Sequence, residues 1–278
     1  MNIVTVLLNK EPEISVISAC YNHGKFIGEM LESVLQQTFR NFEVIVVNDG
    51  STDDTFEILQ RINHEKVKII HSSNQGPSVA RNLAIENARA PLIMNLDADD
   101  KIAPDLLEKA YNVFCSHPDA GIVYCDAICF GAKTGKFEIG DYSLENMLYD
   151  NRIISQAFFK KEDWKKVGGY STEFIFNLED WDFWLLIIEI GRGVYKIPEG
   201  LVFYRTYKNP YESRSGRMKK DRNKTFQSLL TIYNRHRELF SNHPLALERY
   251  LQIEEKLSNE NHIIRFLKNI YFKHFRKI

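Results

Sequence analysis

Residues 91–100 read Pro-Leu-Ile-Met-Asn-Leu-Asp-Ala-Asp-Asp, an apolar run that ends in a group of carboxylates. The apolar part predicts a buried strand, and three similar runs precede it with helical periodicity in the intervals. Such alternation predicts an α/β fold, a mainly parallel sheet with helices on both faces. The expected strands are 14–19, 42–47, 67–70 and 91–96, and the expected helices are 25–37, 53–59, 77–88 and 104–114.

Polar side chains follow each of the four expected strands. Tyr21 and Asn22 come after the first, Asp49 after the second, and Asp97 and Asp99 after the fourth. Ligands of open parallel α/β sheets bind beyond the carboxyl ends of the strands. We therefore expect these side chains to line one pocket, together with the polar residues that follow the third strand.

Asp97 and Asp99 are two positions apart, so in an extended chain their side chains point to the same side. Two carboxylates on one side offer hard oxygen ligands for Mg²⁺ or Mn²⁺. The alternative is a solvated loop that caps the helix expected from Pro104. The position at the end of an apolar strand favours the metal site.

Tyr21 and Asp49 suit a nucleoside, because an aromatic ring stacks on a base and a carboxylate accepts from a base N–H or a ribose hydroxyl. Asp49 equally suits a turn in Asn-Asp-Gly-Ser at 48–51. Arg81, on the third expected helix, could pair with a diphosphate through its bidentate guanidinium. Its alternative role is an ion pair on the helix surface.

From residue 121 onward the rhythm of strands and helices changes. Two runs, 122–130 and 136–139, predict a hairpin. Residues 205–216 are polar and rich in Ser and Arg, which predicts a mobile loop. Further strands are expected at 153–159 and 194–204, with helices at 178–190 and within 217–278.

The 36 basic and 37 acidic residues are unevenly distributed. Residues 217–278 hold 14 basic and 6 acidic residues, whereas residues 1–216 hold 22 and 31. An acidic body lacks the basic groove that nucleic acid requires, so we expect no nucleic acid partner. The four cysteines form no CxxC pair and are expected to be buried, reduced thiols. No apolar stretch reaches the roughly 20 residues of a membrane span.

Seven motifs occur in order along the chain. They are Ser15-Val-Ile-Ser-Ala-Cys-Tyr-Asn22, Leu35-Gln-Gln-Thr-Phe39, Val47-Asn-Asp-Gly-Ser-Thr-Asp53, Gly76-Pro-Ser-Val-Ala-Arg-Asn82, Asp97-Ala-Asp-Asp100, Phe158-Phe-Lys-Lys-Glu-Asp-Trp-Lys-Lys-Val-Gly-Gly-Tyr170 and Leu178-Glu-Asp-Trp-Asp-Phe-Trp184. In this order the chain resembles family 2 glycosyltransferases of the GT-A fold, across residues 13–205.

This resemblance implies a metal-dependent, inverting transfer of a sugar from a nucleoside diphosphate sugar, most often a uridine one. Asp99 is the implied direct ligand of Mn²⁺ or Mg²⁺, and Asp97 assists it. The implied donor-binding residues are Ala19, Tyr21, Asn22, Asp49, Arg81, Asp97, Ala98 and Asp99.

Inversion by a single displacement needs one general base for the acceptor hydroxyl. The resemblance implies Asp180 for this role, with Glu179 beside it, and Trp181 and Asp182 as acceptor contacts. The alternative is that these carboxylates only favour the positive end of the helix.

The chain departs from the family pattern at Tyr207, where members often carry a histidine that helps with metal or phosphate. Arg205, Arg214 or a serine at 213 or 215 could substitute. The alternative function is a nucleotide-sugar-binding scaffold with impaired catalysis. The QxxRW element of the processive synthases is missing, which favours addition of one or a few sugars to a glycan or lipid-linked acceptor in surface polysaccharide synthesis.

We expect a catalytic domain at 1–216, with a nucleotide-sugar half at 13–103 and an acceptor half at 104–216, and a helical appendage at 217–278. The end of the appendage combines apolar residues at helical spacing with lysines and arginines. Such a helix could lie on an anionic membrane or pack on the catalytic domain or a second copy. The reduced thiols and the resemblance imply a cytoplasmic protein, and the tail adds the expectation of either a peripheral contact to the inner face of the membrane or a homo-oligomer.

Overall fold

The first half of the sheet is parallel, as expected from the sequence. The computed structural model describes residues 11–174, 177–213, 216, 222–243 and 248. Its strands β1 (Ile14–Cys20), β2 (Phe42–Asp49), β3 (Val67–Ser72) and β4 (Leu92–Asn95) run side by side in the order β3-β2-β1-β4. Ile14 pairs with both Phe42 and Leu92, so the carboxyl ends of β1, β2 and β4 lie at one edge.

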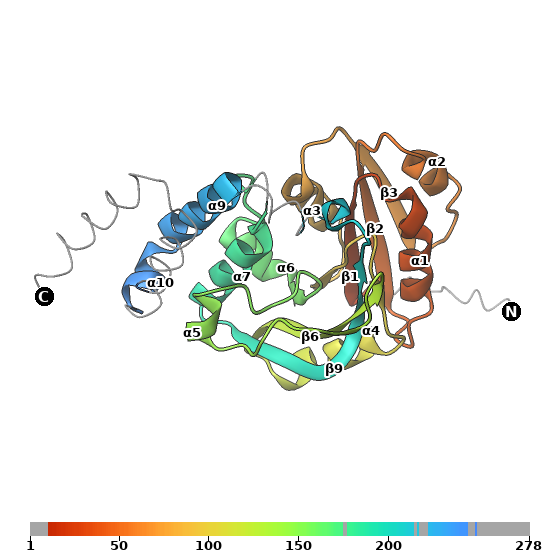
Figure 1. The fold of residues 1–278 in the computed structure, drawn as a ribbon. Coiled ribbons are helices and arrows are strands. Elements are labelled where there is room, and N and C mark those ends of the chain that lie inside the picture. Colours follow the sequence, from red (N-terminus) through yellow and green to blue (C-terminus); the bar gives the residue numbers. More distant parts are fainter. Residues whose placement is uncertain (1–10, 175–176, 214–215, 217–221, 244–247, 249–278) are drawn as a thin grey trace, which may run out of the picture.

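Helices cover both faces of this parallel part. Helices α1 (Gly24–Leu35) and α2 (Thr55–Gln60) lie on one side of β1–β3, and α3 (Pro77–Glu86) lies on the other (Figure 1). Every residue of β2 is buried, and so is nearly all of β1. Continuous apolar strands are typical of a sheet that is covered on both faces, which explains the absence of alternation in their sequences.

The second half of the sheet is mixed, so the expectation of a mainly parallel sheet holds only for the first half. The order continues from β4 through β8 (Phe158–Lys160), β6 (Ala120–Gly131), β9 (Gly193–Thr206) and β5 (Lys101–Ile102), and β7 (Gly135–Phe137) pairs with β6. Strand β8 is antiparallel to both β4 and β6. The expected hairpin is confirmed as β6 and β7.

Two predictions about this half are wrong about where an element begins. The strand expected at 153–159 forms only at its end, as β8. The loop expected from 205 begins later, because β9 stays paired with β6 as far as Thr206, opposite Gly131. Arg205 therefore belongs to a strand, and a short 3-10 helix, Pro210–Glu212, follows. Arg214 lies outside the described residues.

The remaining helices are α4 (Leu106–Ser116), α5 (Leu144–Met147), α6 (Lys161–Val167), α7 (Glu179–Glu189), α9 (Arg222–Arg235) and α10 (Arg237–Ser241). Helices α9 and α10 lie beside α7, on its side away from β1 (Figure 1). The amphipathic tail predicted after residue 260 lies outside the described residues, and the domain boundary at 216 stays a prediction.

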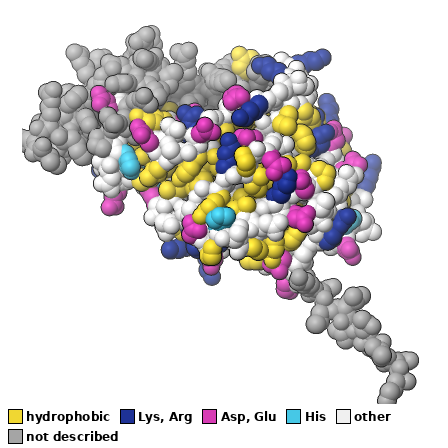
Figure 2. All heavy atoms as spheres, turned by 90° about the horizontal axis from the view of Figure 1, so that it is seen from below, with side chains coloured by type: hydrophobic (Ala, Val, Ile, Leu, Met, Phe, Trp, Pro, Cys, Tyr) yellow, Lys and Arg dark blue, Asp and Glu magenta, His cyan; other side chains and the backbone are white. Residues whose placement is uncertain are grey.

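The described surface carries both signs of charge. On the face shown in Figure 2, acidic and basic side chains are interspersed among hydrophobic ones. Among the described residues, no helix has the length and hydropathy to cross a bilayer. All four cysteines are free, but Cys115 is exposed, so the expectation of buried thiols is wrong for this residue.

Candidate functional site

The loops after β1 and β2 hold each other in place through Asn22. The Asn22 side-chain oxygen accepts from the Thr52 backbone N–H at 2.7 Å, and the Asn22 backbone N–H donates to the Ser51 hydroxyl at 3.0 Å. Asn22 adopts a left-handed backbone with φ of 56°, which asparagine tolerates better than most residues. The polar groups of Asn22 therefore hold the two loops together. The ring of the neighbouring Tyr21 is 43% exposed.

Asp49, the last residue of β2, anchors the start of α3. Its carboxylate accepts from the backbone N–H groups of Gln75 and Gly76, each at 2.9 Å, and from the Ser72 hydroxyl at 3.3 Å. The residue is buried. A carboxylate has about four lone-pair sites, so this one can still accept one further bond from a ligand.

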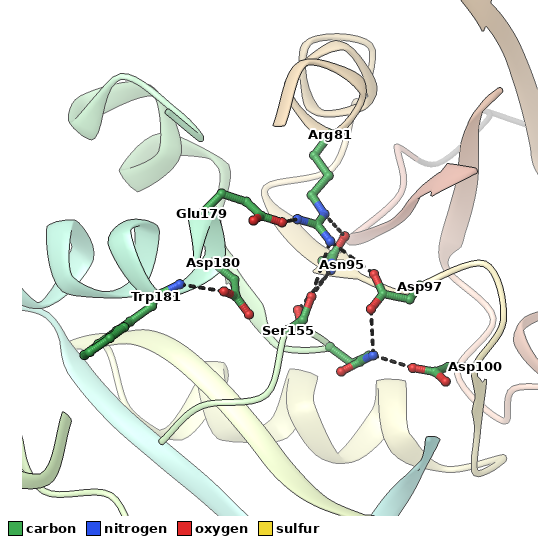
Figure 3. Close-up of polar contacts among 9 residues, drawn as sticks. Arg81, Asn95, Asp97, Asp100, Ser155, Glu179, Asp180 and Trp181 are labelled. Carbon is green, nitrogen blue, oxygen red and sulfur yellow. Dashed lines mark hydrogen bonds and ion pairs between the residues drawn. The ribbon is translucent and has the colours of Figure 1, made fainter. Parts of the chain in front are cut away.

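Arg81 lies at the centre of the polar contacts of the site (Figure 3). Its Nη1 lies 2.5 Å from Glu179 Oε1, and its Nη2 lies 3.1 Å from Asp97 Oδ1. Its Nε donates to the Asn95 side-chain oxygen at 3.1 Å. Burial opposes the charge of Arg81, but Glu179 and Asp97 outweigh it and raise the pKa of the guanidinium. The alternative role, an ion pair on the helix surface, is thus wrong, since Arg81 is buried, and its pairing with a diphosphate stays a prediction.

Three carboxylates gather after β4, at Asp97, Asp99 and Asp100. Gln156 donates to Asp97 Oδ2 at 3.0 Å and also to Asp100. Burial raises the pKa of Asp99, and the charge of Asp97 raises it further. Burial and the charges of Asp99 and Asp97 likewise hold the pKa of Asp100 well above its usual value.

The end of β9 closes this acidic group from one side. The Arg205 backbone N–H donates to Asp100 Oδ1, and its Nε donates to the Asp99 carbonyl, each at 2.8 Å. The Tyr207 hydroxyl donates to the Asp99 carboxylate. Tyr207, where the resemblance led us to expect a histidine, thus contacts the acidic group directly, and Arg205 supplies a positive charge there.

The acidic group has the chemistry of a divalent cation site. Asp97 keeps a third of its side chain exposed, and Asp99 is half-buried. Repulsion among the carboxylates is what a cation would relieve. Among the described residues, no group of three His, Cys, Asp or Glu side chains could hold a metal ion by itself. Asp97 and Asp99 offer carboxylate oxygens that would suit a cation whose other ligands come from a diphosphate and water, as is common for Mg²⁺.

Comparison with known proteins assigns the chain to a family. The family model described as glycosyl transferase family 2 matches residues 15–179, more than half of the chain. The chain belongs to this family. An uncharacterized glycosyltransferase of Haemophilus influenzae is 33% identical over 199 residues, 68% of this chain and 67% of that protein. The chondroitin synthase of Escherichia coli is 32% identical over 68% of this chain, which corresponds to only 28% of that longer protein.

A solved structure agrees with the fold. The mannosyltransferase of Pyrobaculum calidifontis, in complex with GDP-Man and Mn²⁺, has a TM-score of 0.62 and is 21% identical, over 94% of this chain and 79% of that one. At this identity the similarity shows the GT-A fold alone. The fold expected from the sequence is confirmed.

The first turn of α7 carries the carboxylates that the family resemblance points to as catalytic. Glu179 is buried and bound to Arg81, so it holds the helix against α3. Asp180 is partly exposed, and its Oδ1 accepts from the Trp181 backbone N–H at 2.8 Å. Leu178, which precedes the helix, has φ of 70°, so the chain turns sharply into this first turn. In Figure 3, Asp180 lies on the same side of α7 as Ser155.

Two predicted acceptor contacts are buried in the protein. Trp181 donates its indole N–H to the Met147 carbonyl at 2.8 Å and is 1% exposed. The Asp182 carboxylate is fully buried and accepts from Arg235 and His236. In this conformation neither side chain can touch an acceptor, because α5 covers the first and the helices after residue 221 cover the second.

Sequence reasoning missed several groups that complete the site. Asn95, Ser155 and Gln156 connect Arg81 and the acidic group through hydrogen bonds. Ser155 and Gln156 lie within a segment expected to be a strand, and no motif marks them. Asn95 could have been found from the sequence, because it is a polar residue in an otherwise apolar strand, and such a residue needs a hydrogen-bond partner when it is buried.

Proposed function

We propose that the chain transfers a sugar from a nucleoside diphosphate sugar, a uridine one in the first instance, to a hydroxyl of a glycan or lipid-linked acceptor, with inversion. The single observation that carries this proposal is the convergence of Asp97, Asp99 and Arg81 with the Glu179–Asp180 turn at the carboxyl edge of the sheet. Membership of glycosyl transferase family 2 supports the reaction class.

Each group of the site has a role in this proposal. Asp99 and Asp97 would hold Mn²⁺ or Mg²⁺, which when bound supplies Lewis acid assistance to the leaving diphosphate. Tyr21 would stack on the base, and Asp49 would accept a hydrogen bond from the nucleoside. Arg81 sets the distance between the acidic group and α7. Asp180 would take the proton of the acceptor hydroxyl.

The acceptor is proposed from the relatives and the sequence. The name of the chondroitin synthase relative associates that protein with polysaccharide synthesis, which supports a role of this chain in making a surface polysaccharide. We place the donor in the half at 13–103 and the acceptor beside α7, in the half at 104–216. A cytoplasmic location, with the tail after residue 260 on a membrane or a second copy, remains part of the proposal.

Donor binding provides the direct test. A panel of UDP- and GDP-sugars is screened for thermal stabilisation with and without Mn²⁺, because a ligand of the folded state raises its stability. We expect one donor to stabilise the wild type in a metal-dependent way, and Asp99→Asn to abolish both this effect and transfer. Asp141→Asn, an exposed carboxylate on a loop, is the matched control. Metal dependence that survives in Asp99→Asn would contradict the assignment.

One observation favours the second candidate, a nucleotide-sugar-binding scaffold. Tyr207 stands where the family often has histidine, and its hydroxyl binds Asp99. Release of the sugar to water in the presence of Mn²⁺ distinguishes the two candidates. Donor binding without any hydrolysis or transfer would favour the scaffold.

A further inference from the structure

The junction between α9 and α10 holds a buried charged cluster that the proposed reaction does not use. His236, between the two helices, is fully buried, as is Asp182 of α7. The His236 Nε2 lies 3.0 Å from Asp182 Oδ1, and its Nδ1 lies 3.1 Å from Glu189 Oε1. Arg235 Nε lies 2.6 Å from the same Asp182 oxygen.

This geometry favours the charged form of His236. His236 Nε2 forms a hydrogen bond with Asp182, whereas Nδ1 has no hydrogen-bond partner and meets Glu189 as an ion pair. Only the imidazolium carries the positive charge that both carboxylates attract. Burial lowers the pKa of His236, but Asp182 and Glu189 outweigh burial and raise it. Arg235 is the other charge at Asp182, and Glu173 in turn pairs with Arg235 at 3.2 Å.

The same helix turn is also tied to the donor half. Glu179 lies one turn before Asp182 on α7 and binds Arg81 of α3. Asp180 lies between these two anchors in sequence. Its position relative to Asp97 and Asp99 therefore depends on both contacts, one from α3 and one from the α9–α10 junction.

We propose that His236 and Arg235 are positioning residues, through which the C-terminal helices hold the first turn of α7 so that Asp180 meets the acceptor. Neither residue touches the acidic group or Arg81 in the described contacts, so they act through Asp182. This inference rests on the proposed function for its kinetic part and on the structure alone for the position of α7.

The test compares His236→Gln with Arg237→Gln, an exposed neighbour on α10. We expect His236→Gln to lower kcat at least tenfold at pH 6 while the KM for the donor changes less than twofold. The ratio of wild-type to variant kcat should fall as the pH rises through the pKa of His236, since the wild type then loses its charge. Arg237→Gln should match the wild type. A ratio that does not change with pH would overturn the proposal, because a packing role does not titrate.

Amide hydrogen exchange of residues 179–183 in the full chain needs no activity and separates this inference from the proposed function. We expect several-fold faster exchange in His236→Gln than in the wild type and Arg237→Gln. Equal exchange in all three proteins would overturn the proposal, even if no donor is ever found. If His236→Gln does not fold, the hydrogen exchange of Arg235→Gln, which is less buried, is measured instead; faster exchange at residues 179–183 is expected, and exchange equal to the wild type would overturn the proposal.

Discussion

Asp180 and Glu179 are neighbours in sequence, but the structure gives them different surroundings. Glu179 is buried against Arg81, whereas Asp180 is partly exposed at the start of α7. A base must reach its substrate, which favours Asp180. Glu179 instead neutralises a buried guanidinium. Replacement of either carboxylate by its amide should therefore affect different properties of the protein.

Asp180→Asn should reduce kcat by about 10²–10⁴, the usual contribution of a general base, and leave donor affinity nearly unchanged. The amide keeps the size of the side chain and cannot take the proton. Steady-state kinetics with the donor found by screening measure this effect. If Asp182→Asn had the larger effect on kcat with an intact fold, the base would have been assigned to the wrong carboxylate.

At the scale of single elements, two glycines differ in whether their positions tolerate a side chain. Gly50 follows β2 with φ of 67°, and a Cβ there would lie 2.6 Å from the Asn74 backbone nitrogen. Gly28 lies exposed within α1, and a Cβ there would meet nothing within 4 Å. The first glycine lets the loops after β2 and β3 approach each other, and the second only weakens its helix.

Gly50→Ala should lower the free energy of unfolding by about 1–3 kcal/mol, the usual cost of a strained backbone conformation. Gly28→Ala should raise it by about 0.5–1 kcal/mol, because alanine loses less entropy in a helix. Urea denaturation of the two variants and the wild type measures both changes. Equal effects of the two substitutions would show that the loop contact at Asn74 does not constrain Gly50.

Glu43 connects β2 to β1 and to the turn before β4. It accepts from the Ser15 hydroxyl and the Arg89 backbone N–H, each at 2.7 Å, and from Arg89 Nε at 2.9 Å. Burial alone would raise the pKa of Glu43, but these bonds outweigh it and lower the pKa below 4.5. Its stabilising contribution is therefore present above pH 4.5 and is lost as the pH falls through the lowered pKa.

Glu43→Gln should thus reduce stability at pH 7 and should flatten the loss of stability on acidification below pH 4.5. Denaturation curves at pH 7, 5 and 3.5 measure the difference between the two proteins. Glu57→Gln, an exposed residue on α2, serves as the control and should leave the profile unchanged. A constant difference across the three pH values would mean that the bonds of Glu43 do not titrate in this range.

At the scale of the whole molecule, the pair of Arg81 and Glu179 joins the parallel half to the later half. The two residues are 98 positions apart, and both side chains are at most 5% exposed. Glu179→Gln leaves a buried guanidinium with fewer compensating charges. We expect a loss of about 3–5 kcal/mol in unfolding free energy, the usual cost of breaking a buried ion pair. Lys109→Gln, whose partners Asp105 and Glu199 are 41% and 50% exposed, should cost less.

Thermal unfolding, monitored by the fluorescence of the tryptophans, two of which lie on α7, measures this coupling. The double variant Arg81→Gln and Glu179→Gln should recover part of the loss, because no fully buried charge of this pair then lacks a partner, and Asp97, which also loses Arg81, is partly exposed. A loss of unfolding free energy in the double variant that equals or exceeds the sum of the two single losses would contradict a direct interaction between the two residues.

The parallel half and the acidic strand end were predictable from the sequence because their signals are local. A run of apolar residues becomes a buried strand wherever it pairs, and two positions that alternate along it, as at Asp97 and Asp99, face the same side. The ordered motifs extended this to the family and the fold. The later strands were less predictable, because the length of β9 depends on its partner β6.

Only the tertiary structure decided which groups meet. Arg81 binds Glu179 across 98 positions, Tyr207 binds Asp99 across 108, and Asp182 turns away from the site toward His236. From the sequence, Glu179, Asp180 and Asp182 are three acids on one helix turn, and only the family resemblance singles out Asp180. Packing gives them different surroundings, because Glu179 meets Arg81 of α3 and Asp182 meets Arg235 and His236 at the α9–α10 junction. These contacts neutralise two of the carboxylates and leave Asp180 partly exposed.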